Sequence, residues 1–209
     1  MTDLVKYPKT YHLPWSLGLQ NDDRLLPDIN CFIDKKIVVT EKMDGENTSL
    51  YQGHIHARSL DSAHHVSRSW VKAKWGEIRA YIPQGWRICG ENLYAKHSIF
   101  YENLETYFMV FSIWDEHNEC LSWDETEEWC LMLGLKTVPV LFRGEFDERT
   151  LKCFHESMDL EKQEGYVVRN VDSYHFSNFY ENIAKFVRKG HVSTSEHWMT
   201  QPVIKNLLK

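Results

Sequence analysis

Short runs rich in apolar and β-branched residues recur along this chain and constrain its fold more than any other feature. Runs of this length predict β-strands rather than helices. The predicted strands cover residues 36–40, 49–51, 54–57, 86–93, 107–114, 138–142, 166–171 and 182–187. Many follow one another with no helix between them, and 49–51 and 54–57 form a predicted hairpin around Gln52-Gly53. Antiparallel pairing is therefore expected.

Three segments have the spacing of helices instead. Residues 67–82 place aromatic and apolar side chains at helical intervals, with a basic face between them, and Pro83 ends the segment. Residues 123–133 begin with acidic side chains and end before Gly134, a predicted C-cap, while 148–157 predict a short helix. Strands outnumber helices, so the predicted class is α+β with mainly antiparallel sheets.

The chain of 209 residues is long enough for one domain with a sizeable core. Residues 1–30 are rich in turn signals, including Pro8, Pro14, Pro27 and Asn21-Asp22-Asp23, and predict an ordered N-terminal arm or lid. Residues 31–209 form the predicted domain. The roughly twenty residues after the last predicted strand are too few for a second one.

The composition limits the compartment and the partners of the protein. The 24 basic and 30 acidic residues give a net charge of −6, so any site for a polyanion must be a local basic patch. Five cysteines without a Cys-x-x-Cys pair argue against a disulfide framework. Neither a signal peptide nor a membrane-length apolar run is present. These features predict a monomeric cytoplasmic protein without a membrane or an evident protein partner.

The segment Lys42-Met43-Asp44-Gly45-Glu46-Asn47 follows the predicted strand 36–40. A lysine at the end of a strand is held in place by the sheet, and Asp44-Gly45 predicts a tight turn. In a partly desolvated pocket, the pKa of such a lysine can fall far enough for its amine to act as a nucleophile. On its own, the motif is better explained by a hairpin turn with a solvated lysine.

Further motifs follow Lys42 along the chain. They are Arg58-Ser59, Glu91 in CGEN, Trp114-Asp115 after MVFSI, Glu164-Gly165 before YVVR, and Lys185, Arg188 and Lys189 in AKFVRK. In kind and order, across residues 42–189, this set resembles the motifs of the covalent nucleotidyltransferases, which are the polynucleotide ligases and messenger RNA capping enzymes. Within that superfamily, the chain is most similar to the ATP-dependent RNA ligases.

Two features of the resemblance favour this branch. DNA ligases usually carry Arg at the sixth position of the lysine motif, where RNA ligases more often carry Asn, and this chain has Asn47. DNA ligases and capping enzymes also add a downstream OB domain, for which residues 190–209 leave no room. The resemblance therefore implies a single adenylyltransferase domain, an ATP-grasp-like nucleotidyltransferase of mainly antiparallel sheets with flanking helices and no OB domain. The alternatives are a minimal DNA ligase or nick sealer, a capping guanylyltransferase, and an inactive module that binds RNA or a nucleotide.

The resemblance implies a three-step reaction on RNA, of use in RNA repair. Lys42 attacks the α-phosphorus of ATP and becomes bonded to AMP, with pyrophosphate as the leaving group. The AMP then moves to a 5′-phosphate end, and a 3′-hydroxyl finally attacks that activated end. Each step requires in-line geometry and compensation of phosphate charge.

Roles for the other motif residues follow from the same resemblance. Arg58 would contact phosphate oxygens or the ribose, and Lys185, with Arg188 or Lys189, would neutralise the α-phosphate. Glu91 would accept from the ribose 2′-hydroxyl and reach a metal-bound water. Glu164 and Asp44 would hold waters of Mg²⁺ or Mn²⁺. Asn47 would contact the RNA ends being joined.

Some assignments remain open between two residues or two interpretations. Trp114 would stack on adenine, but it can equally be a core residue, and Phe111 is a competing stacker on the same predicted strand. The family usually shows Lys-x-Lys in the last motif, so Arg188 and Lys189 are both candidates for its second basic residue. The histidines, including His54 and His56, match no known zinc spacing and are interpreted as surface or phosphate-contacting residues.

Overall fold

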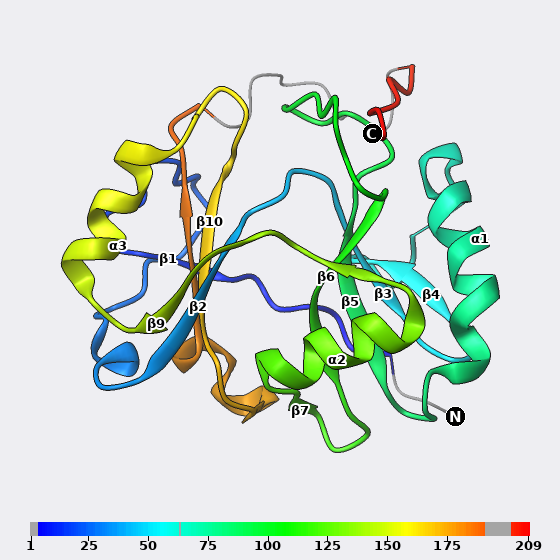
Figure 1. Ribbon diagram of the computed structural model, residues 1–209, viewed down its shortest axis with the longest axis horizontal. Coiled ribbons are helices and arrows are strands. Elements are labelled where there is room, and N and C mark those ends of the chain that lie inside the picture. The colour runs from blue at the N-terminus through cyan, green and yellow to red at the C-terminus, as the bar shows by residue number, and fades with distance from the viewer. Residues whose placement is uncertain (1–3, 63, 191–201) are drawn as a thin grey trace.

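The computed structural model describes residues 4–62, 64–190 and 202–209, which form two β-sheets standing next to each other (Figure 1). A five-stranded sheet has the order β1-β12-β10-β2-β9. Its strands are β1 (Tyr11–His12), β12 (Ile183–Val187), β10 (Gly165–Asn170), β2 (Lys36–Glu41) and β9 (Val140–Glu145). All neighbours in this sheet are antiparallel except β1, which pairs parallel with β12.

The second sheet has seven strands. It follows the order β11-β7-β6-β5-β3-β4, with β8 paired to β6 outside this path. The strands are β3 (Glu46–Leu50), β4 (Ile55–Ala57), β5 (Arg87–Asn92), β6 (Phe108–Trp114), β7 (Glu119–Cys120), β8 (Lys136–Thr137) and β11 (Tyr174–His175). The predicted hairpin of β3 and β4 is confirmed. The predicted strand at 138–142 is displaced, because the chain changes sheets between β8 and β9.

Helices cover the outer faces of the two sheets (Figure 1). On the five-stranded sheet, α3 (Glu148–Phe154) packs Leu151 against apolar side chains of β2, β10 and β12. On the seven-stranded sheet, α1 (Ser69–Ile78) and α2 (Trp123–Leu133) bury side chains against β3, β5 and β6. Short 3₁₀ helices lie at η1 (Asn30–Phe32), η2 (Val66–Arg68), η3 (Arg79–Tyr81), η4 (His155–Ser157) and η5 (Phe176–Glu181).

The predicted α+β class with mainly antiparallel sheets is confirmed. The predicted helix at 123–133 coincides with α2, and Gly134 takes the left-handed conformation of a C-cap, with φ of 61°. Arg68, a basic residue within the predicted helix at 67–82, lies on no exposed face, because it is buried and bonded to Glu46. Within the described part of the chain, no helix has the length and apolarity needed to cross a membrane.

The segment after Lys42 is not the predicted tight turn. Strands β2 and β3 belong to different sheets, so residues 42–45 carry the chain from one sheet to the other. Gly45 is needed here for close packing, since a Cβ atom would lie 2.5 Å from the carbonyl oxygen of Asn92. The crossing places Lys42 between the two sheets instead of on a solvent-exposed hairpin.

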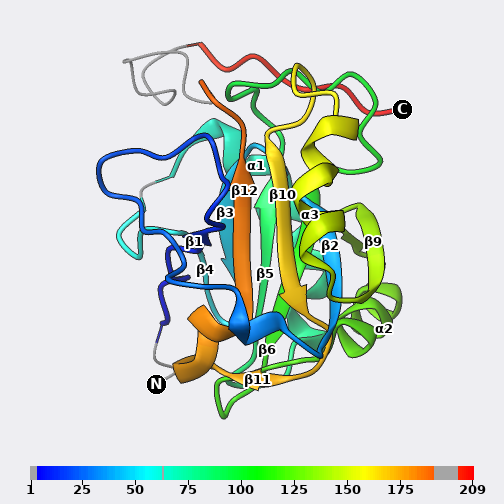
Figure 2. The same ribbon diagram turned by 90° about the vertical axis from the view of Figure 1, so that its left-hand side faces the viewer.

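The N-terminal arm is part of the five-stranded sheet. Figure 2 shows it running beside β12 on the face turned to the viewer. In β1, Tyr11 and His12 pair with Ala184 and Lys185, and backbone bonds from residues 13, 17 and 18 continue this contact as far as Val187. The arm is therefore docked along β12. The division of the chain at residue 30 stays a prediction.

Strands β10 and β12 approach so closely at Gly165 that this position excludes any side chain. A Cβ atom there would lie 1.9 Å from the carbonyl oxygen of Phe186. We expect Gly165→Ala to lower the free energy of unfolding by about 1–3 kcal/mol, because the two strands must separate. Urea denaturation followed by circular dichroism measures this. Gly53→Ala is the matched control, since nothing lies within 4 Å of its Cβ position, and equal stability of the two variants would contradict the prediction.

Candidate active site

A cavity of about 200 Å³ lies between the two sheets. It is lined by Glu41, Lys42, Val167, Arg169, Ile183 and Lys185 from the five-stranded sheet and the segment that follows β2. The other wall contributes Asn47, Arg58, Glu91 and Phe111, and the arm contributes Tyr7, Pro8, Lys9 and Thr10. A cavity of about 150 Å³ already accepts a benzene-sized ring, so this one admits a nucleobase.

The alternation of side chains along β10 and β12 explains this arrangement. Tyr166 and Phe186 point to the outer face and pack under α3, while Val167 and Lys185 point inward to the cavity. Since Val167 pairs with Lys185 across the two strands, one register fixes both inward-facing positions. The lysine at 185 is therefore held by a strand that is paired on both sides, by β10 and by β1.

Lys42 and Glu164 form the central contact of the site. The Nζ atom of Lys42 donates to Oε2 of Glu164 over 2.5 Å, and the Glu164 side chain is only 7% exposed. Burial favours the neutral amine of Lys42, but the charges of Glu164, Glu91 and Asp44 outweigh it and raise the pKa of Lys42 above its ordinary value. The expected lowering of this pKa is therefore wrong for the protein without nucleotide, because three carboxylates surround the amine.

Glu91 stands on β5 opposite Asn47 of β3 and accepts a hydrogen bond from the backbone N–H of Gly45 over 3.1 Å. Burial raises the pKa of Glu91 to about 8, against the opposing effect of Lys42 and with a further rise from the Glu164 and Asp44 charges. Because burial and neighbouring charges disfavour the ionised form of Glu91, a hydroxyl donor or a cation bound beside it would stabilise the carboxylate.

The pKa of Lys185 is shifted in the opposite direction to that of Lys42. Burial lowers the pKa of Lys185 to about 8, and the charge of Lys42 lowers it further, although Asp23 and Glu164 act against both. The two lysines therefore interact, and they differ because Lys42 is surrounded by more carboxylates.

This difference predicts two separate lysine titrations in the protein without nucleotide. Above pH 8 the Lys185 amine is mostly neutral, whereas the Lys42 amine, whose pKa is raised above the ordinary lysine value, loses its proton only at a higher pH. Nuclear magnetic resonance of ¹³Cε-labelled lysines between pH 6 and 11 measures both, with Lys185→Met to assign the earlier signal. A Lys42 signal that titrates first would show that its carboxylates do not dominate.

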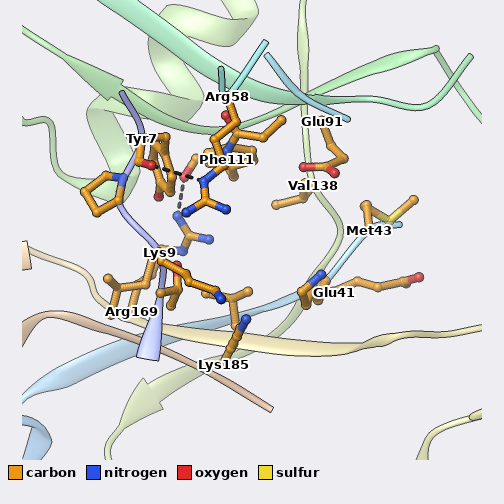
Figure 3. A pocket seen from close by; sticks show the side chains of 16 residues that line it. Tyr7, Lys9, Glu41, Met43, Arg58, Glu91, Phe111, Val138, Arg169 and Lys185 are labelled. Carbon is orange, nitrogen blue, oxygen red and sulfur yellow. Dashed lines mark hydrogen bonds between the residues drawn. The ribbon is translucent and has the colours of Figure 1, made fainter. Parts of the chain in front are cut away.

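Arg58 and Arg169 extend toward each other across the cavity (Figure 3). Arg58 follows β4, lines the cavity and donates through Nε to the carbonyl oxygen of Tyr7 over 3.4 Å. Arg169 of β10 donates to the carbonyl oxygen of Phe111, and its Nε atom has no hydrogen-bond partner among the described residues. Both guanidinium groups can bind phosphate oxygens.

Asn47 lines the same wall as Glu91. Its Oδ1 atom is buried and, within the described part of the chain, accepts no hydrogen bond. Buried polar atoms in folded proteins are nearly always paired, so an unpaired acceptor that faces a cavity favours a ligand with a donor group. A hydroxyl group of a sugar is such a donor.

The prediction that Trp114 stacks on adenine is wrong. Its side chain is 0% exposed and packs against Tyr174, Phe176 and Phe179 at the end of β6. Phe111, the competing candidate, lines the cavity with its ring in edge contact with Tyr7. A bulge in the pairing of β5 and β6 lies close to Phe111, and a strand pattern of period two cannot predict this irregularity.

The predicted metal-water role of Asp44 is not supported either. Its Oδ2 atom accepts hydrogen bonds from the N–H and hydroxyl of Ser98 and from the N–H of Ile99, all within 2.8 Å. Asp44 therefore holds the loop at residues 98–99 and is not among the described residues that line the cavity. The effect of Asp44 on the site is electrostatic, through the pKa values of Lys42 and Glu91.

The two candidates for the second basic residue of the last motif lie beyond β12. Arg188 is half-buried and donates its backbone N–H to the carbonyl oxygen of Glu164. Lys189 is exposed in a turn, and neither side chain lines the cavity in the described structure. Three residues that do line the cavity were not predicted from the sequence: Tyr7, Lys9 and Arg169. The available signals were the position of Lys9 in the arm and that of Arg169 in the YVVR motif.

The carboxylates present fit a divalent cation that keeps most of its waters. In the described ranges there is no group of three or more His, Cys, Asp or Glu side chains placed to hold a metal ion. Magnesium, however, usually binds proteins through one or two carboxylates together with substrate phosphates. Glu91 and Glu164, whose charges affect each other, are such a donor set.

Comparisons with known proteins agree with this geometry. A family model described as RNA ligase matches residues 35–187. A search of curated proteins finds no match. Solved structures of an RNA ligase from Naegleria gruberi share the fold, with 20% sequence identity and a TM-score of 0.57 for the form with pyrophosphate. A mutant form of that ligase with ATP and manganese shares 20% identity at a TM-score of 0.55.

In both comparisons the match covers 87% of this chain but only 57% of the Naegleria chain. A further mutant form with AMP and manganese gives 19% identity and a TM-score of 0.54, with the same coverage. This chain therefore spans little more than half the length of those ligases. At such identities the likeness concerns the fold, which is that of the nucleotidyltransferase part of an RNA ligase.

Proposed function

Because this chain belongs to the RNA ligase family, we propose that it joins a 5′-phosphate end and a 3′-hydroxyl end of RNA, with ATP as the energy source and an AMP bonded to Lys42 as the intermediate. The observation that carries the proposal is that Lys42, Glu91 and Lys185 line one cavity, with Glu164 bonded to Lys42, although these residues come from separate segments of both sheets.

In the first step, the Nζ atom of Lys42 attacks the α-phosphorus of ATP. A nitrogen–phosphorus bond forms, and the bond between that phosphorus and the bridging oxygen breaks, so that pyrophosphate leaves with the electron pair. Before it attacks, the lysine must lose a proton, and Oε2 of Glu164, at 2.5 Å, is the nearest described acceptor. A bound Mg²⁺ or Mn²⁺ ion would offset the charges of the phosphates and carboxylates.

The surrounding residues orient the nucleotide. Phe111 offers its ring to adenine, because aromatic side chains stack on bases irrespective of sequence. Glu91 accepts a hydrogen bond from the ribose 2′-hydroxyl, which favours ribonucleotides. Arg58 and Lys185 contact phosphate oxygens, and Lys185 lies close enough to Lys42 for their charges to interact. Asn47 receives the RNA ends in the later steps.

Intact-mass measurement after incubation with ATP and magnesium tests the proposal. We expect a gain of one AMP per chain, with GTP giving none. Nicked duplexes of RNA and of DNA then separate an RNA ligase from a DNA nick sealer, because only the RNA nick should be sealed efficiently. Binding of RNA without any covalent AMP would instead indicate an inactive binding module and would refute the proposal.

A further inference from the structure

The N-terminal arm brings an additional lysine to the cavity. Lys9 is one of the cavity-lining residues, and it lies two positions before β1, which is paired with the strand that carries Lys185. Figure 3 shows the side chains of Lys9 and Lys185 on the same side of the cavity. Because His12 pairs in register with Lys185, the position of Lys9 is fixed relative to that strand.

One buried carboxylate, that of Asp23, holds both lysines. Its Oδ1 atom is 3.3 Å from Nζ of Lys9 and 3.8 Å from Nζ of Lys185, and the side chain is 7% exposed. Its Oδ2 atom accepts from the N–H of Gln20 and is 3.1 Å from Nε2 of His12. Two ammonium groups within 4 Å of one oxygen atom are close enough to bind a single phosphate-sized anion together.

The charges of the lysines that line the cavity also affect one another. After burial, the like charge of Lys42 is the next cause that lowers the pKa of Lys185, and the charge of Lys9 lowers it as well. The charge of Lys185 therefore interacts with the charges of both other lysines. Three lysines that line one cavity can compensate the charges of a triphosphate, whose leaving group must lie opposite the attacking nitrogen for in-line attack.

We propose that Lys9 binds the β- and γ-phosphates of ATP and therefore the pyrophosphate that leaves when Lys42 is adenylylated. This inference rests on the proposed function and names a residue for its first step. As the α-phosphorus bonds to Nζ of Lys42, the bridging oxygen departs with the bonding electrons. The additional negative charge then develops on pyrophosphate, where the ammonium group of Lys9 compensates it.

Calorimetric titration of the AMP-free protein with magnesium pyrophosphate tests the binding directly. A charge-assisted contact of this kind corresponds to about tenfold to a hundredfold in affinity, so Lys9→Met should raise the dissociation constant by that factor. Lys9→Arg should restore most of the affinity. Lys6→Met is the matched control, because Lys6 is an exposed lysine of the same arm that lies outside the lining residues, and it should leave the constant unchanged.

Two kinetic measurements distinguish a Lys9 that binds pyrophosphate from a Lys9 that binds the phosphate of RNA. Lys9→Met should slow single-turnover formation of the AMP adduct by a factor similar to its loss of affinity. It should leave the sealing of pre-adenylylated nicked RNA, measured without ATP, unchanged. Unaltered pyrophosphate binding would overturn the inference, as would a selective loss of sealing, which would assign Lys9 to the RNA.

The outcomes also distinguish this inference from the proposed function. If the unmodified protein forms an AMP adduct and Lys9→Met forms it equally fast, the inference fails and the proposed function stands. If no adduct forms in the unmodified protein but pyrophosphate binding still depends on Lys9, the phosphate site stands and the ligase function fails.

Discussion

Protein carrying Lys42→Ala should acquire no label from α-³²P-ATP, whereas the unmodified chain should become labelled. The variant removes the only amine in contact with Glu164 among the described residues. Without a nitrogen nucleophile the adduct cannot form, so the loss should exceed a thousandfold, as for removal of other covalent nucleophiles. Label transfer followed by denaturing gel electrophoresis measures this directly.

Lys42→Ala also leaves the buried Glu164 carboxylate without its cation, so a loss of activity alone does not separate chemistry from stability. Lys42→Arg is the better matched variant, because a guanidinium group keeps the charge but is never deprotonated in proteins. We expect it to fold and remain unlabelled. Lys36→Ala, at the exposed start of β2, which ends just before Lys42, should be labelled normally. Labelled Lys42→Arg would move the nucleophile to another residue, with Lys185 the first candidate.

Asn47→Ala should separate the first step from the last. The variant should still form the AMP adduct within a fewfold of the normal rate, because Asn47 contacts neither Lys42 nor Glu164 in any described hydrogen bond. Sealing of pre-adenylylated nicked RNA should fall by about a hundredfold, the usual cost of removing one positioned polar group from a transition state. Quench-flow measurements of the two reactions test this.

The exposed amide of Asn30 provides a control for the same substitution. Asn30→Ala should leave both reactions unchanged. An equal loss of adduct formation and sealing in Asn47→Ala would show that its unpaired Oδ1 atom serves ATP instead of the RNA ends.

The strands and helices could be predicted because their signals are local. The helix α2 was predicted to the residue, since its acidic first turn and Gly134 act within a few positions of the backbone they stabilise. The pairing of strands was not predictable in this way. Strand β2 lies between β10 and β9, which follow it by about a hundred residues or more, and no short-range pattern indicates which strands meet.

The residues of the site likewise include some that local motifs predicted and some that only the tertiary structure placed. Lys42, Arg58, Glu91 and Lys185 were predicted from ordered motifs at strand ends, and the structure places all four around one cavity. Trp114 belongs to the same strand as Phe111, but residues of the segment 174–179 cover its ring, whereas Phe111 lines the cavity. The interpretation of Asp44-Gly45 as a tight turn failed because the chain crosses between sheets there.

By itself, the amino-acid sequence determined the α+β class, the positions of most strands, and a set of charged residues whose kind and order resemble those of the RNA ligases. Only the tertiary structure decided that Lys9 and Arg169 join that set, that Trp114 and Asp44 leave it, and that Lys42 is held as a cation. The reason is physical. Backbone conformation depends on neighbours along the chain, whereas burial and charge depend on neighbours in space, which long-range strand pairing alone brings together.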